Sequence, residues 1–119
     1  FDLVIDRAAL THNSTEAIER CIANVHERMP TGGHYVGVDW FATDHDEFAA
    51  GEPDVDEYTR TGYKSGPFAG LGRVHFSDRE HLTQLFEQFE ILTLEKKVVQ
   101  RDLPTPWKQA MWNLVARKA

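Results

Sequence analysis

The sequence predicts an α/β fold: a parallel strand–helix–strand unit, then a second helix and a terminal antiparallel hairpin. Two observations support this prediction. An apolar run at 1–5 is followed by a helical pattern over 14–29, a Gly-rich turn and a second strand-like run. Two further strand-like runs lie next to each other at the C-terminal end. Strand, helix and strand in this order form a βαβ unit, whose strands are parallel and whose crossover is almost always right-handed.

The first strand is expected over Phe1–Ile5, where the apolar run is nearly continuous. Such runs are typical of strands buried on both faces, although periodicity alone does not distinguish them from a buried helix. A helix is expected over Ser14–Met29, where apolar residues recur at helical spacing. Asn13 or Ser14 caps its start, and Pro30–Gly33 ends it.

The rest of the chain is less regular. A strand over His34–Trp40 is followed by residues 42–76, a long stretch with several glycines and prolines. A loop of this length is expected to be a lid or binding insertion, with a short helix over Asp54–Arg60. Ser77 and Glu80 then form a capping box ahead of a helix. That helix presents apolar residues on one side, and two strands follow it: Leu82, Leu85, Phe86, Phe89; Glu90–Gln100, Trp107–Arg117.

Composition limits the partners. The 119 residues are expected to form one domain, 1–119. A formal net charge of -6 disfavours nucleic acid or an anionic membrane as a partner, and no apolar run is long enough to span a membrane. Cys21, the single cysteine, excludes an internal disulfide, fits a reducing cytoplasmic compartment and is expected in the core. Because the chain begins at Phe1, inside an apolar strand, we expect it to be a piece of a longer protein.

Three segments point to a family. Phe1-Asp-Leu-Val-Ile-Asp6 is similar to a strand that precedes a loop lining a methyl donor. Arg28-Met-Pro-Thr-Gly-Gly33 with Tyr35-Val-Gly-Val38 resembles an L-x-P-G-G turn and the strand after it. Trp112–Lys118 looks like a last, antiparallel strand. Together, over nearly the full chain apart from residues 42–76, they resemble the C-terminal half of class I S-adenosylmethionine-dependent methyltransferases.

The resemblance implies half of a Rossmann-like sheet, S-adenosylmethionine as cofactor and a small-molecule methyl acceptor. The family's G-x-G-x-G loop and the acidic residue that holds the ribose belong to its N-terminal half, and neither occurs here. In the full fold, that loop brings the backbone close to the cofactor. We therefore expect a methyltransferase fragment that is inactive by itself.

The loop after the first strand is the best-placed binding segment, because ligands in open α/β sheets lie beyond the carboxyl ends of strands. By resemblance, Asp6, Arg7 and Ala8 would lie near the methionine end of the cofactor. Thr11 and His12 would face the methyl group or the acceptor. The alternative is an Asp6–Arg7 ion pair, with Thr11 helping to cap the helix. His12 is either a general base, since imidazole titrates near neutral pH, or a solvated or capping residue.

Other candidates lie at the end of the second strand and in the insertion. Asp39 and Trp40 share the sheet edge and are expected to contact substrate, with a core role for Trp40 as the alternative. The aromatic and basic residues of the insertion suit closure over a substrate that carries an acidic group. The alternative is an insertion that packs its aromatic side chains on the sheet. The substrate-binding candidates here are Tyr58, Arg60, Tyr63 and His75.

Metal binding is the weaker interpretation of one further motif. Asp44–Glu47 combines carboxylates with an imidazole, which are metal-ligand types. Adjacent residues rarely converge on one ion, so a solvated loop is favoured and no metal is expected.

Two hypotheses compete with a methyltransferase. One is a non-enzymatic α/β module that works through the insertion or through oligomerisation. The other is half of a nucleotide-binding dehydrogenase, which the terminal hairpin fits less well. Because the first strand would present an unpaired edge, we expect chains to pair there into a homo-oligomer.

Overall fold

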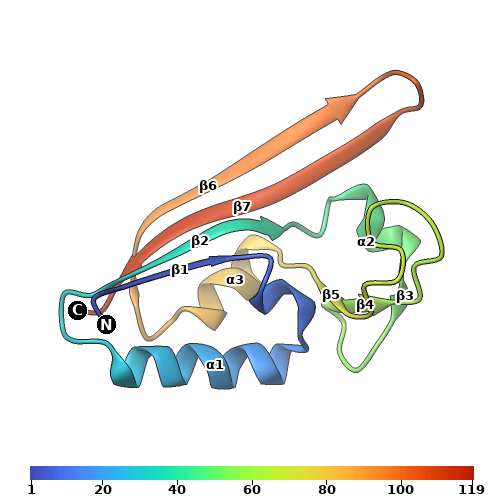
Figure 1. Cartoon of the computed structure of the whole chain (residues 1–119). Coiled ribbons are helices and arrows are strands. Elements are labelled where there is room, and N and C mark those ends of the chain that lie inside the picture. Colours follow the sequence, from blue (N-terminus) through green and yellow to red (C-terminus); the bar gives the residue numbers. More distant parts are fainter.

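The computed structural model describes residues 1–119 and has two layers (Figure 1). A four-stranded sheet lies over two helices that cover one of its faces, and a smaller three-stranded sheet lies at one end. None of the helices has the length and apolar character that crossing a bilayer requires. The elements are β1 (Leu3–Arg7), a 3₁₀ turn (Leu10–His12), α1 (Thr15–Arg28), β2 (His34–Phe41), α2 (Asp46–Ala50), β3 (Glu52–Pro53), β4 (Thr59–Thr61), β5 (Val74–His75), α3 (Arg79–Leu85), β6 (Glu90–Arg101) and β7 (Trp107–Arg117). The class is α/β, as the sequence predicts.

The first three elements form the predicted unit. β1 and β2 are parallel and pair along all five residues of β1. Ser14, one of the two predicted caps of α1, accepts the N–H of Ala17 at 3.2 Å. After the helix, Gly33 packs directly against Met29, and a Cβ at this position would clash with the Met29 side chain. The turn therefore requires glycine for close approach, which explains the Gly-rich signal.

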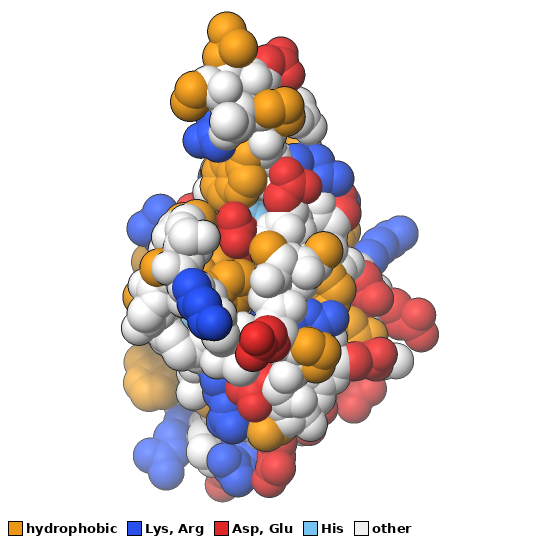
Figure 2. All heavy atoms as spheres, turned by 90° about the vertical axis from the view of Figure 1, so that its right-hand side faces the viewer, with side chains coloured by type: hydrophobic (Ala, Val, Ile, Leu, Met, Phe, Trp, Pro, Cys, Tyr) orange, Lys and Arg blue, Asp and Glu red, His pale blue; other side chains and the backbone are white.

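β6 and β7 form the predicted hairpin, but the last strand lies inside the sheet. The strand order is β1-β2-β7-β6, and β7 is antiparallel to both of its neighbours. β6 pairs with β7 along its whole length, whereas β2 ends at Phe41, so the outer half of the hairpin projects as an arm (Figure 1). Figure 2 shows apolar side chains gathered at the tip of this arm, where Leu103 is 82% exposed.

The main core lies between the sheet and the two helices α1 and α3. Its centre is aromatic: the rings of Tyr35 and Trp40 from β2 lie 5.1 and 5.5 Å from that of Phe86, which follows α3. Ile18 and Ile22 of α1 are fully buried in the same cluster. The apolar helix faces predicted from spacing are therefore largely the faces that the core buries.

β1 differs from its prediction. Leu3 and Ile5 are 54% and 66% exposed, because no element covers the sheet face opposite the helices (Figure 1). Val4 and Asp6 alternate with them and are more buried. The expectation that this strand is buried on both faces is therefore wrong.

Residues 42–76 are structured and packed. They contain α2 and the small sheet, whose order is β3-β4-β5. A second apolar cluster of Phe68, Val74 and Phe76 joins this region to β2, since the ring of Phe41 lies 4.9 Å from that of Phe68. The insertion thus has its own small core beside the carboxyl end of β2.

Two local predictions are wrong because an aspartate side chain accepts hydrogen bonds from nearby groups of the chain. At 54–60 there is no helix, because the Asp56 carboxylate accepts hydrogen bonds from groups two and three residues later and forms a turn into β4. α3 starts one residue later than the capping box predicts: Asp78 accepts the N–H of His81 at 2.7 Å. The backbone N–H of Ser77 donates instead to the carbonyl of Phe41 at the end of β2, and its C=O accepts the N–H of Thr43 just after that strand.

Candidate functional site

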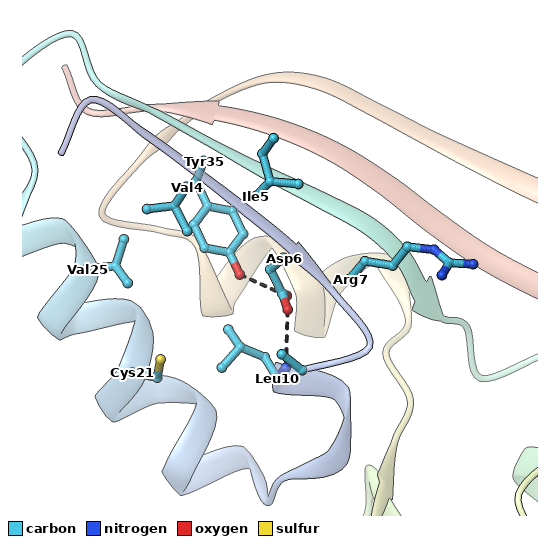
Figure 3. A pocket seen from close by; sticks show the side chains of 9 residues that line it. Val4, Ile5, Asp6, Arg7, Leu10, Cys21, Val25 and Tyr35 are labelled. Atoms are coloured by element: carbon cyan, nitrogen blue, oxygen red, sulfur yellow. Dashed lines mark hydrogen bonds between the residues drawn. The ribbon is translucent and has the colours of Figure 1, made fainter.

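One buried carboxylate, that of Asp6, holds the loop after β1. Its Oδ2 accepts the hydroxyl of Tyr35 and the indole N–H of Trp40, both at 2.9 Å. Its Oδ1 accepts the backbone N–H of Leu10 at 3.3 Å, and Figure 3 shows the bonds to Tyr35 and Leu10. Burial, together with the negative charge of Asp6, raises the pKa of Tyr35. Asp6 therefore ties the carboxyl end of β1 to β2 and to the loop.

The loop backbone turns sharply and then enters the 3₁₀ turn. Ala8 has a φ of +59°, in the left-handed region that non-glycine residues seldom adopt. Thr11 is fully buried, and its hydroxyl has no hydrogen-bond partner. Ser14 caps α1, so the alternative role of Thr11 as a helper in capping is wrong.

Asp39 connects three elements at the surface. Its carboxylate lies 3.2 Å from the Arg7 Nε of β1 and 2.8 Å from the Lys97 Nζ of β6. Asp39 has a φ of +56° and lies where β2 slips register against β7. The hydrogen bond from Lys97, aided by Arg7 and opposed by partial burial, lowers the pKa of Asp39. The predicted residues Arg7 and Asp39 therefore lie together, and the alternative Asp6–Arg7 ion pair is wrong.

His12 connects this loop to the insertion. Its Nδ1 lies 3.1 Å from the carbonyl oxygen of Arg73. A carbonyl only accepts hydrogen bonds, so Nδ1 carries a proton and donates it, which leaves Nε2 as the basic atom of the neutral ring. Arg73 in turn pairs with Asp54 at 2.8 Å. The orientation of the imidazole is thus set by residues of the insertion.

A cavity of about 270 Å³ opens beside the loop, between β1 and α1 (Figure 3). Its walls are mostly apolar, and Asp6, Arg7 and Tyr35 supply its polar groups. Cys21 lies on the α1 wall and is only partly buried, so its predicted place in the core is wrong. Burial and the charge of Asp6 raise the pKa of this thiol, which keeps it protonated near neutral pH.

Three of the predicted substrate residues have side chains engaged in packing. Trp40 is 1% exposed and belongs to the core. The Arg60 guanidinium lies 4.0 Å from the ring centroid of Phe48, and its Nε–H donates to the backbone carbonyl of Phe48. The Tyr63 hydroxyl donates to the carbonyl of Glu47 at 2.6 Å, and burial raises the pKa of Tyr63 to about 12. These contacts hold α2 against β4 and the segment after it.

The acidic stretch after β2 is not a solvated loop. Asp44 pairs with Lys96 on β6, and Glu47 accepts the indole N–H of Trp107 on β7 at 3.1 Å. His45 between them is 2% exposed. The side chains of this acidic stretch therefore join the hairpin arm to the insertion. This role accounts for the metal-ligand residue types that occur here in sequence.

Two predicted residues, Tyr58 and His75, meet at a buried histidine pair. The Nε2 atoms of His75 and His81 are 3.0 Å apart, and the ring of Tyr58 stacks on His81 at 3.6 Å. Burial, followed by the proximity of His81 and opposed by Asp56, lowers the pKa of His75 to about 4. Burial also lowers the pKa of His81. His81 was not predicted; its only signal is a histidine in the first turn of an expected helix.

The comparisons with known proteins give structural matches alone. No protein-family model matches the chain, and no curated protein matches its sequence. A S-adenosylmethionine-dependent methyltransferase from Methanosarcina mazei matches with a TM-score of 0.72 and 17% identity, over 99% of this chain and 59% of that one. TehB from Haemophilus influenzae matches with a TM-score of 0.58 and 16% identity, over 99% and 35%. A protein described by the conversion of a disulfide bond into a thioacetal group during echinomycin biosynthesis matches at 0.57 and 16%, over 99% and 49%.

These matches show a methyltransferase-like fold. The identities of 16–17% support a statement about fold alone. The chain spans between 35% and 59% of the length of the three structures.

Removing the buried carboxylate should destabilise the protein. Asp6→Ala leaves buried donors of Tyr35 and Trp40 without an acceptor, and each such donor costs roughly 1–3 kcal/mol. We expect the free energy of unfolding, measured by urea denaturation, to fall by about 4 kcal/mol. Asp2→Ala removes an exposed carboxylate just before β1 and should change it by less than about 0.5 kcal/mol. Equal effects of the two variants would contradict this role.

Stability should fall in acid because of the histidine pair. The folded state lowers the pKa of His75 from 6.5 to about 4, so the unfolded chain binds the proton more readily. The contribution of the neutral ring is complete above about pH 6.5 and is lost as the pH falls towards about 4, a change of about 3 kcal/mol. Urea denaturation across this range measures it. His75→Asn should lose most of the decrease and His12→Asn should keep it; the reverse pattern would refute the assignment.

Proposed function

We propose that this chain is the C-terminal, substrate-side part of a class I S-adenosylmethionine-dependent methyltransferase domain that acts on a small molecule. The observation that carries the proposal is the strand order β1-β2-β7-β6, with the last strand antiparallel between β2 and β6. It agrees with the last, antiparallel strand that the resemblance implies at 112–118. The structural likeness to methyltransferases over 99% of the chain supports it further.

The proposed binding segment is the loop at the carboxyl end of β1. Here Asp6, Arg7 and Ala8 lie near the methionine end of the cofactor, and Thr11 faces its methyl group or the acceptor. Asp6 also positions the loop through its three hydrogen bonds. Two observations support this. The Arg7 side chain is 68% exposed and presents a guanidinium suited to a carboxylate. The buried hydroxyl of Thr11 has no partner within the chain.

The residues present fit one end of the cofactor. The cavity beside the loop is small and mostly apolar. The sequence has no G-x-G-x-G loop after a strand, and the outer edge of β1 has no neighbour. When bound, S-adenosylmethionine supplies an electrophilic methyl group on a sulfonium. We propose that its binding also needs an N-terminal half, so that the 119 residues alone do not catalyse transfer.

The proposed acceptor is a small molecule, and the proposed compartment is the cytoplasm. The net charge of -6 argues against nucleic acid as the acceptor. His12 is the proposed general base. Because its Nδ1 donates to the carbonyl of Arg73, the free Nε2 is the atom that would take a proton from the methyl acceptor. The proposed substrate-side residues are Asp39, Tyr58, Arg60, Tyr63 and His75. Trp40 lies in the core, so its proposed role is indirect, through its hydrogen bond to Asp6.

One observation favours a second function. The outer strands β1 and β6 each have a neighbour on one side only. A non-enzymatic α/β module that joins a partner through such an edge would need no cofactor. Cofactor binding therefore separates the two functions.

Titration with S-adenosylhomocysteine tests the enzyme proposal. The full-length product of the gene should bind it with a Kd of about 1 μM, equivalent to about -8 kcal/mol, by calorimetry. The 119-residue chain alone should give no heat. Absence of binding to the folded full-length product would contradict the proposal. Micromolar binding to the short chain would refute the need for further residues.

His12→Ala tests the proton acceptor in the full-length product. General bases contribute roughly 10²–10⁴-fold, so we expect kcat to fall by about 100-fold while the Kd for S-adenosylhomocysteine changes by less than about twofold. His34→Ala, at the amino end of β2, is the matched control. Unchanged turnover of the His12 variant would exclude it as the base.

A further inference from the structure

β6 is a long edge strand with several exposed apolar side chains. It has twelve residues and pairs on one side only, with β7. Figure 1 shows its outer edge free along its length. Leu92, Val98 and Val99 are 45%, 50% and 49% exposed. Long edge strands with apolar side chains readily pair with another chain.

The charges of β6 are sorted along the strand. Its first half carries Glu90 and Glu95, and its second half carries Lys96, Lys97 and Arg101. A parallel copy would face like charges with like, which is unfavourable across a sheet. An antiparallel copy would face the acidic half with the basic half. The partner that complements this edge in both hydrogen bonding and charge is therefore a second β6.

We propose that two copies of this chain pair antiparallel through the outer edges of β6 to form one continuous sheet about a two-fold axis. Such an axis stands perpendicular to the sheet and preserves its faces, so it must pass through a residue pair rather than between residues. With the axis at Lys96, Glu95 lies opposite the partner's Lys97, whose ammonium also pairs with Asp39 of its own chain, and Leu94 lies opposite the partner's Val98. Each of these pairs occurs twice.

Registers shifted by one residue in either direction place less favourable side chains opposite each other. An axis at residue 95 sets the two copies of Glu95 against each other and places Leu94 opposite a lysine. An axis at residue 97 sets the two copies of Lys97 against each other. Like charges directly opposite are destabilising, whereas opposite charges and apolar pairs stabilise. Of these three registers, only the one centred on Lys96 sets unlike charges opposite each other.

The lysine on the axis is already compensated within its own chain. The Lys96 ammonium pairs with Asp44 and lies 5.4 Å from the ring centroid of Trp112. Both contacts draw it towards the body of its own subunit and away from the other copy. The central like-charge pair is thereby weakened.

The other free edge is a poorer candidate. β1 has five residues, less than half the length of β6. Fewer backbone groups can pair there, and no sorting of charge selects an antiparallel copy. This places the expected homo-oligomer contact at β6 rather than at the first strand.

Light scattering coupled to size-exclusion chromatography tests the proposal on the 119-residue chain. The unmodified chain should elute with twice the mass of one chain. Glu95→Lys and Lys97→Glu should each elute with the mass of one chain at the same protein concentration, because each sets like charges opposite each other. Mixing the two variants in equal amounts should restore the doubled mass, since each charge then meets its opposite.

Controls keep the outcome decisive. Glu27→Lys makes the same charge change on the exposed side of α1 and should leave the doubled mass intact. The double variant Glu95→Lys with Lys97→Glu should also dimerise, which shows that a single variant has not simply unfolded. A single-chain mass for the unmodified protein would overturn the proposal. So would a doubled mass that survives in both single variants, which would place the contact at another surface such as β1.

Discussion

The buried carboxylate of Asp6 is the interaction on which the rest of this structure depends. A charge removed from water is tolerated only when its oxygens are hydrogen-bonded. The donors come from the ring hydroxyl of Tyr35, the indole of Trp40 and the backbone of Leu10. Strand pairing, the aromatic core and the loop are therefore coupled, since moving any of them breaks a bond to the same group. The hydrogen bonds to Asp6 thus fix the position of the loop relative to the core.

The second constraint is that the helices cover one face of the sheet. α1 and α3 bury the inner side chains, while Leu3 and Ile5 of β1 stay exposed on the other face. Exposed apolar surface beside an unpaired strand is typical of a surface that another polypeptide covers. Pairing through β6 would lengthen the sheet without covering this face, so the proposed N-terminal half of the methyltransferase domain is the partner that would cover it.

Regular elements were predictable because their signals are local. The spacing of Ile18 and Ile22, the Ser14 cap and the apolar runs at the C-terminal end all act within a few residues. The helix expected at 54–60 was wrong because the Asp56 side chain competes for backbone groups, which periodicity does not register.

The candidate site was predictable in part. Placing Arg7 and Asp39 at neighbouring strand ends follows from parallel pairing. The contribution of Lys97 could not be predicted, because it depends on the reversed order of β6 and β7 and on a bulge in β2. The histidine pair likewise joins residues from β5 and α3 whose approach is tertiary.

The central position of β7 has a consequence during synthesis. The ribosome makes this strand after β2 and β6, yet both of them need it as their shared neighbour. Until residues 107–117 emerge, the nascent chain exposes two unpaired strand edges, which are targets for chaperones and for misassembly. Premature termination here would therefore remove the middle of the sheet rather than trim its margin.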